Sequence, residues 1–67
     1  MYRYEIWDLV TRNLVEDFDD EAATSDALRE MRRLDTLVLA RRDTRGGTEW
    51  LGRGVELQRF IRAHTPA

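Results

Sequence analysis

The chain holds a single histidine, His64, close to its carboxyl end, and no cysteine. Nucleophilic catalysis needs a nucleophile held beside a base, and one histidine without a placed partner supports no catalytic triad. We expect His64 instead to finish a C-terminal helix, where a partly charged imidazole suits the negative end of the helix dipole. The sequence therefore predicts a protein that is not an enzyme, with no catalytic residue and no cofactor.

Four carboxylates form the one acidic cluster that could bind a hard cation such as magnesium or calcium. They are Asp17, Asp19, Asp20 and Glu21. Their spacing lacks the glycine and the distant glutamate of a calcium-binding loop. One aspartate can instead cap a helix that begins here, while the others suit the positive end of its dipole. We therefore predict helix capping and no metal site.

The glycines of the second half do not form a phosphate-binding loop, because neither G-x-G-x-x-G nor G-x-x-x-x-G-K occurs. Gly52, Arg53 and Gly54 do precede an expected helix, whose free amides could hold an anion beside the arginine. A plain turn explains the same residues more simply. We favour the turn.

Charge is divided unevenly along the chain. Residues 1–26 carry two arginines against eight carboxylates, and residues 27–67 carry nine arginines against five carboxylates. This division suits a solvated mixed surface, an acidic or nucleic-acid partner for the second half, or attraction between copies. Aromatic residues near arginines would let bases stack, so a small nucleic-acid-binding or regulatory protein is the alternative function. The arginines that could form a basic patch are Arg29, Arg32, Arg33, Arg41, Arg42, Arg45 and Arg53.

Apolar periodicity and turn residues predict six elements. A polar turn at 11–13 should place Asn13 in a left-handed conformation, and the glycine-containing segment 44–47 should form a second turn. Thr24 and Ser25 are weak helix formers that could instead cap a later helix start. The elements that we expect are strands at 2–10, 14–18, 36–40 and 48–51, and helices at 20–33 and 55–64.

This order predicts an α+β fold of the type ββαββα, with a four-stranded antiparallel sheet and two helices mainly on one face. A chain of 67 residues has room for one core, so we expect a single domain over 1–67. No apolar run is long enough for a signal peptide or a membrane helix, and the lack of cysteine fits a reducing compartment. We expect a cytoplasmic protein without a membrane partner.

Both faces of the expected sheet are apolar. Side chains alternate along a strand, so Tyr4 and Ile6 point one way while Trp7 points the other. Two helices can cover only one face, and the other face then needs a cover from outside, most simply another copy. The alternatives are a face that is merely apolar, or a bulge near Asp8 or Leu9 that returns Trp7 to the core.

The sequence therefore predicts a small interaction module that forms a homodimer or docks a protein partner through an apolar sheet face. Large aromatic side chains dominate the binding energy of interfaces. The candidate anchors are Tyr2, Tyr4, Trp7 and Trp50.

Part of the chain resembles a known class of small bacterial proteins. The residues that carry the resemblance are YEIWD at 4–8, TRNLV at 11–15, Phe18 with Asp19, and the alanine-bearing helix that follows. They resemble small stand-alone bacterial proteins and, in function, are most similar to HicB-like antitoxin domains. Those domains also place a hairpin before a helix and associate with partners, so the resemblance implies a binding module. The proline and Gly-Cys features typical of the antitoxins are missing here, and the resemblance therefore implies neither toxin binding nor any site residue.

Overall fold

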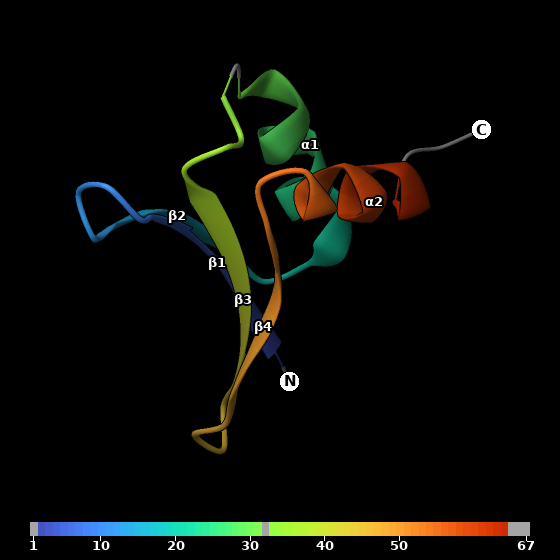
Figure 1. Ribbon diagram of the computed structural model, residues 1–67. Helices are drawn as coiled ribbons and strands as arrows, with labels where there is room; N and C mark the ends of the chain where they lie inside the picture. The colour runs from blue at the N-terminus through green and yellow to red at the C-terminus, as the bar shows by residue number, and fades with distance from the viewer. Residues whose placement is uncertain (1, 32, 65–67) are drawn as a thin grey trace.

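The computed structural model describes residues 2–31 and 33–64, and within them the chain runs ββαββα (Figure 1). The strands pair antiparallel in one sheet, in the spatial order β2-β1-β3-β4. The predicted α+β fold is confirmed. The elements are β1 (Tyr2–Asp8), β2 (Asn13–Phe18), α1 (Glu21–Glu30), β3 (Leu37–Asp43), β4 (Thr48–Arg53) and α2 (Glu56–Ala63).

The core lies between the sheet and the two helices. Ile6 and Leu39 of the central strands are fully buried, together with Leu28 of α1 and Leu57 of α2. Both helices therefore pack on the same face of the sheet, and Figure 1 shows them gathered on one side. We call the other face the open face. Neither helix in the described part of the chain is long and apolar enough to cross a membrane.

The first turn differs from the predicted one. β1 ends at Asp8 because its Oδ1 accepts hydrogen bonds from the backbone amides of Val10 at 2.8 Å and Thr11 at 3.3 Å. Bonds of this kind compete with strand pairing and favour a turn. The residue in the left-handed region is Arg12, with φ of 61°, and Asn13 begins β2 instead. The prediction for Asn13 is therefore wrong by one position.

The acidic cluster starts α1, as predicted. Asp20 is the N-cap, and its Oδ1 accepts a hydrogen bond from the Ala23 amide at 2.6 Å. Thr24 and Ser25 do not cap a later start, because both are fully buried inside the helix. Their hydroxyls donate to backbone carbonyls, Thr24 to that of the N-cap residue Asp20 at 2.8 Å and Ser25 to that of Ile61 in α2 at 3.4 Å, so both buried hydroxyls are satisfied. The helix ends at Glu30 rather than at 33.

A bulge in β2 decides which side chains reach the open face. Ile6 pairs with Glu16, but the next residue, Trp7, pairs with Leu14, so Val15 is the extra residue. Pairing of β1 with β3 shows no such shift. Because the bulge lies in β2, alternation along β1 is unbroken and Trp7 stays on the open face. The alternative in which a bulge returns Trp7 to the core is wrong.

A second bulge lengthens β4. Leu39 pairs with Gly52 while Ala40 pairs with Trp50, which leaves Leu51 as the extra residue. The strand therefore continues through Gly52 instead of breaking there. The same glycine allows a close approach to α2, since a Cβ at Gly52 would lie 3.0 Å from the Cβ of Glu56.

Gly54 has a conformation that only glycine adopts readily, with φ of 56°. Gly54→Ala is therefore expected to destabilise the fold by about 1–2 kcal/mol, the cost of a left-handed residue with a Cβ. The nearest atom to that Cβ, the Asp35 carbonyl oxygen at 3.9 Å, adds no clash. Urea denaturation of Gly54→Ala checks this result, and Gly47→Ala, which lacks a positive φ, is the matched control. Equal losses in the two variants would contradict the prediction.

Candidate functional site

Two tryptophans flank the central strand β3 on the open face. Trp7 is the cross-strand partner of Val38, and Trp50 is the partner of Ala40. Val38 is only 6% exposed and Ala40 is 0% exposed, although no helix of the described residues lies over them. Cross-strand partners have Cβ atoms about 4.5–5.5 Å apart, so each indole can lie against its smaller neighbour. The tryptophans and these two residues form the apolar centre of the open face.

The apolar surface continues to both sides of this centre. Leu14, the partner of Trp7 in β2, is 42% exposed, and Trp50 is 63% exposed. A hollow of about 320 Å³ lies beside Val38. Its lining residues are Leu9, Val38, Trp50, Leu51, Gly52, Arg53 and Glu56. The sequence-based prediction missed Leu14 and the hollow, because the two bulges determine both.

A charged network lies beside the apolar centre. Glu5 is only 9% exposed, and its Oε1 accepts a hydrogen bond from Trp7 Nε1 at 3.1 Å and lies 3.4 Å from Arg42 Nη2. A buried carboxylate is costly unless it is paired in this way, so the network holds the indole of Trp7 in place. Beside it, Arg3 Nε donates to Asp17 Oδ2 at 2.8 Å, and this hydrogen bond lowers the pKa of the Asp17 carboxyl.

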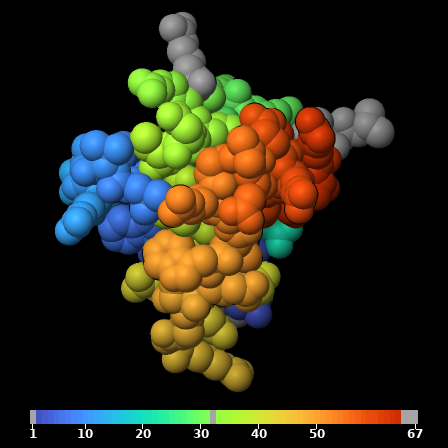
Figure 2. Space-filling view, viewed as in Figure 1, coloured from blue at the N-terminus to red at the C-terminus, as the bar shows by residue number. Residues whose placement is uncertain are grey.

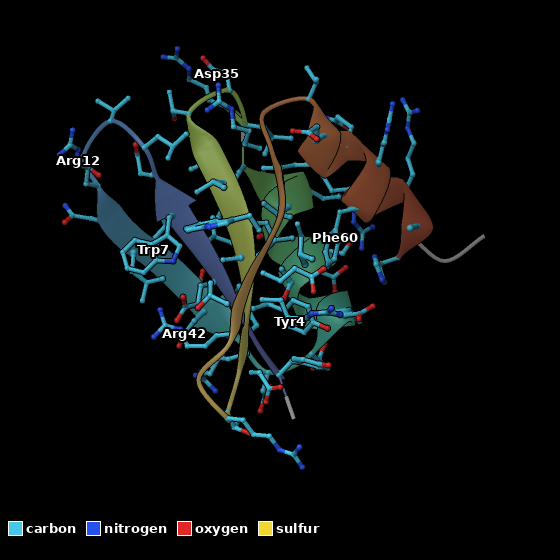
Figure 3. All side chains as sticks on the ribbon, turned by 60° about the horizontal axis from the view of Figure 1, so that its bottom comes forward. Tyr4, Trp7, Arg12, Asp35, Arg42 and Phe60 are labelled. Atoms are coloured by element: carbon cyan, nitrogen blue, oxygen red, sulfur yellow. The ribbon has the colours of Figure 1, made fainter. Side chains whose placement is uncertain are left out.

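The two tyrosines that were candidate anchors lie on the helix-covered side. Tyr4 is 5% exposed and belongs to the core, and Figure 3 shows it directed toward α2, with Trp7 on the opposite side of the sheet. Tyr2, the first residue of β1, is half-exposed, and the Arg41 guanidinium lies 4.3 Å from the centre of its ring. Of the four candidates, the structure brings only Trp7 and Trp50 together on the open face.

A tyrosine, a glutamate and the histidine meet where the helix ends come together. Tyr4 Oη donates a hydrogen bond to Glu21 Oε1 at 2.6 Å, and His64 Nε2 contacts the other carboxylate oxygen. His64 is the C-cap residue of α2, as predicted, and its Nδ1 lies 2.8 Å from the Phe60 carbonyl oxygen. The hydrogen bond from Tyr4 lowers the pKa of Glu21, and burial raises the pKa of Tyr4. The cluster ties the end of α2 to the start of α1 and to β1.

The predicted basic patch is dispersed over the molecule. Arg29 belongs to the last turn of α1, whereas Arg45 lies in the turn between β3 and β4. Figure 2 shows these segments at opposite ends, green at the top and gold at the bottom. Arg41 and Arg42 are adjacent in β3 and therefore point to opposite faces of the sheet.

Most of the patch arginines are held by carboxylates of this chain. The ion pairs join Arg29 to Asp26, Arg33 to Asp35, Arg41 to Glu49 and Arg42 to Glu5. Arg42 and Arg53 are the members that share the open face, and Arg32 lies outside the described residues. The structure therefore does not assemble the six described arginines into one surface.

The backbone amides of Arg53 and Gly54, which could have bound an anion at the start of α2, are bonded to groups of the protein. The Gly54 amide donates to the Leu37 carbonyl at 3.1 Å, and the Arg53 amide donates to Glu56 Oε1 at 3.4 Å. A carboxylate thus stands where an anion would bind. Within residues 2–31 and 33–64, no three acidic or histidine side chains are grouped closely enough to hold a metal ion.

Comparison with known proteins gives no relative: no family model, no curated protein and no solved structure matches this chain. An assignment of function therefore rests on the geometry of the open face.

Proposed function

We propose that this chain is a non-enzymatic interaction module that self-associates or docks a protein partner through the open face of its sheet. One observation carries the proposal: large apolar side chains are exposed together on the one sheet face that no described helix covers. Trp50 and Leu14 flank the half-buried Trp7 across that face. Soluble monomers rarely leave such surfaces uncovered, and buried aromatic anchors supply most of the binding energy of interfaces.

The pairing of the arginines supports a protein partner over a nucleic acid. On the open face, Arg3 is paired with Asp17 and Arg42 with Glu5. A single strand would need several unpaired cations near the tryptophans to neutralise its phosphates. Of the described arginines on this face, Arg53, which lines the hollow with Trp50, is the one in no ion pair. The cytoplasmic assignment belongs to the same proposal and rests on composition, since a chain without cysteine depends on no disulfide.

Trp50 is the better residue for a test, because Trp7 also bonds to the buried Glu5 and its loss would disturb the fold. Trp50→Ser is expected to weaken self-association about 30-fold, which corresponds to an interface hot spot of about 2 kcal/mol. Sedimentation equilibrium over a range of micromolar concentrations measures this change. Val55→Ser is the matched control, since Val55 is 85% exposed at the start of α2 and lines a different hollow, with Met31 and Leu34.

A parent protein that stays monomeric at every concentration would contradict self-association. A labelled single-stranded oligonucleotide at low salt tests the alternative function directly. Binding that weakens steeply with added salt and is lost in Trp50→Ser would favour the nucleic-acid function over the proposed one.

A further inference from the structure

His64, the C-cap residue of α2, has both nitrogens of its ring in contact with oxygen atoms. Nδ1 lies 2.8 Å from the Phe60 carbonyl oxygen, and Nε2 contacts Oε2 of Glu21 in the first turn of α1. The imidazole also lies against the ring of Phe60, with 4.3 Å between the ring centres, and Phe60 in turn lies beside Tyr4 (Figure 3). The ring is therefore held by packing, and its side chain is only 27% exposed. We call the two polar contacts the His64 bridge.

Neither of these oxygen atoms can donate a proton to the ring. A backbone carbonyl only accepts hydrogen bonds. The Glu21 carboxyl could donate only if it were protonated, but the hydrogen bond from Tyr4 lowers the pKa of Glu21 below 4.5, so at neutral pH it also only accepts. A neutral imidazole has one N–H and can donate to one of the two oxygens, whereas an imidazolium donates to both. The two contacts together therefore require a protonated His64.

We propose that the His64 bridge makes the packing of α2 on α1 sensitive to pH: the imidazolium joins the two helices in mildly acidic solution, and loss of its proton breaks one contact. Histidine side chains ordinarily change charge at about pH 6.5, so this change falls close to neutral pH. The contact with Glu21 is the one that breaks, because a neutral ring no longer carries the charge that attracts a carboxylate. Nδ1–H can still donate to the Phe60 carbonyl. The inference does not depend on the proposed function.

The charged and titratable groups around the ring keep their charge state near neutral pH. Tyr4 of β1 donates to the other oxygen of Glu21, and burial raises the pKa of Tyr4, so this side chain stays neutral. Arg41 of β3 stays charged, and its Nη2 lies 2.7 Å from Oε2 of Glu49 in β4. Histidine is the side chain whose charge ordinarily changes between pH 5 and pH 8. Protonation of His64 is therefore the step that controls the bridge in this range.

The bridge lies where the helices have a weak polar link. The Ser25 hydroxyl of α1 donates to the Ile61 carbonyl of α2 at 3.4 Å, which is long for a hydrogen bond of this type. A bond between an imidazolium and a carboxylate is stronger than one between neutral groups. Loss of the contact with Glu21 should therefore loosen the last turn of α2, where the His64 amide donates to Ile61.

The direction of the pH effect follows from the charge that the bridge needs. The folded chain makes a contact that requires the proton on His64, and the unfolded chain does not. The stability that the bridge contributes is therefore present in mild acid and is lost as the pH rises toward 8. It is also lost in strong acid, as the pH falls through the lowered pKa of Glu21. The contribution is expected to be largest at about pH 5–6, between the ordinary values of the two side chains.

A double-mutant cycle at pH 5 and at pH 8 tests the bridge. Glu21→Gln, His64→Phe, which keeps a ring against Phe60, and the double variant are compared with the parent by urea denaturation. At pH 5 the combined effect on the unfolding equilibrium constant should be about threefold smaller than the product of the separate effects. At pH 8 it should equal that product. The matched control is the same cycle for the ion pair of Arg3 with Asp17, whose coupling should not change between these pH values.

NMR spectroscopy of the parent gives a second test, which needs no variant. His64 is the only histidine of the chain, so its ring signals are unambiguous. At pH 5 we expect both ring nitrogens to be protonated and nuclear Overhauser contacts to join the ring to the Glu21 side chain. At pH 8 one nitrogen should lose its proton and these contacts should weaken. Contacts that persist unchanged at pH 8, or coupling in the cycle that is equal at both pH values, would overturn the inference. If His64→Phe does not fold, the spectra of the parent decide alone.

Discussion

Replacing Ile6 by alanine is expected to destabilise the fold by about 2–5 kcal/mol, because it leaves a cavity among side chains that cannot fully collapse around it. Ile6 is 0% exposed and belongs to the same cluster as Leu28, Leu39 and Leu57, which come from three other elements. A core of this size rarely supplies more than about 3–5 kcal/mol in total. Ile6→Ala should therefore lose much of the net stability of the fold, as measured by urea denaturation.

The control for Ile6→Ala is Val55→Ala, which removes apolar atoms from a side chain that is 85% exposed. Surface changes of this kind stay within about 0.5 kcal/mol. Both variants need measurement at low protein concentration, because a dimer would add stability by mass action. A loss below 1 kcal/mol for Ile6→Ala would mean that the core does not centre on this face of β1.

Ile6 and its neighbour Trp7 illustrate how far the sequence predicts the fold. Alternation along the first strand places them on opposite faces, and this was predictable because the strand contains no bulge. Alternation alone does not say which face is the core. The core face is the one on which the helices pack, through Leu28 and Leu57. This packing joins residues far apart in the sequence, so alternation within one strand does not reveal it. For this reason Tyr4, a candidate interface anchor from the sequence, lies in the core.

The bulges could not be predicted from the sequence. Val15 and Leu51 are extra residues only relative to the strands that they pair with, and pairing register is a property of the whole sheet. Each bulge changes the face of every residue beyond it in its own strand. The exposure of Leu14 and the hollow beside Val38 follow from these shifts, so both features required the structure.

The described arginines of the predicted basic patch are dispersed because the third strand is longer than predicted. Arg41 and Arg42 follow the predicted strand at 36–40, but β3 continues to Asp43, and neighbours in a strand point to opposite faces. The carboxylates that pair with the arginines, such as Glu5 and Glu49, come from other strands, so these ion pairs depend on the same long-range register.

The hydrogen bond from Tyr4 to Glu21 is expected to limit stability at acid pH. The pKa of Glu21 is lowered below its ordinary value of 4.5, first by this hydrogen bond, so the folded state favours the carboxylate. Its stabilising contribution is present above pH 4.5 and is lost as the pH falls through the lowered value. The pKa of Tyr4 is raised above 10.0, mainly by burial, so its neutral form is favoured and its contribution is lost only in strong alkali.

Tyr4→Phe removes the hydroxyl and keeps the ring in the core, so it isolates this bond. It is expected to cost about 1 kcal/mol at neutral pH, because the Glu21 carboxylate remains partly open to water and can be hydrated in the variant. The difference in unfolding free energy between parent and variant should shrink between pH 5 and pH 3, about the ordinary carboxyl pKa. Tyr2→Phe, at a half-exposed ring, should give a difference that does not change over this range. If the difference in unfolding free energy between parent and Tyr4→Phe is as large at pH 3 as at pH 7, the hydrogen bond from Tyr4 to the Glu21 carboxylate does not stabilise the fold.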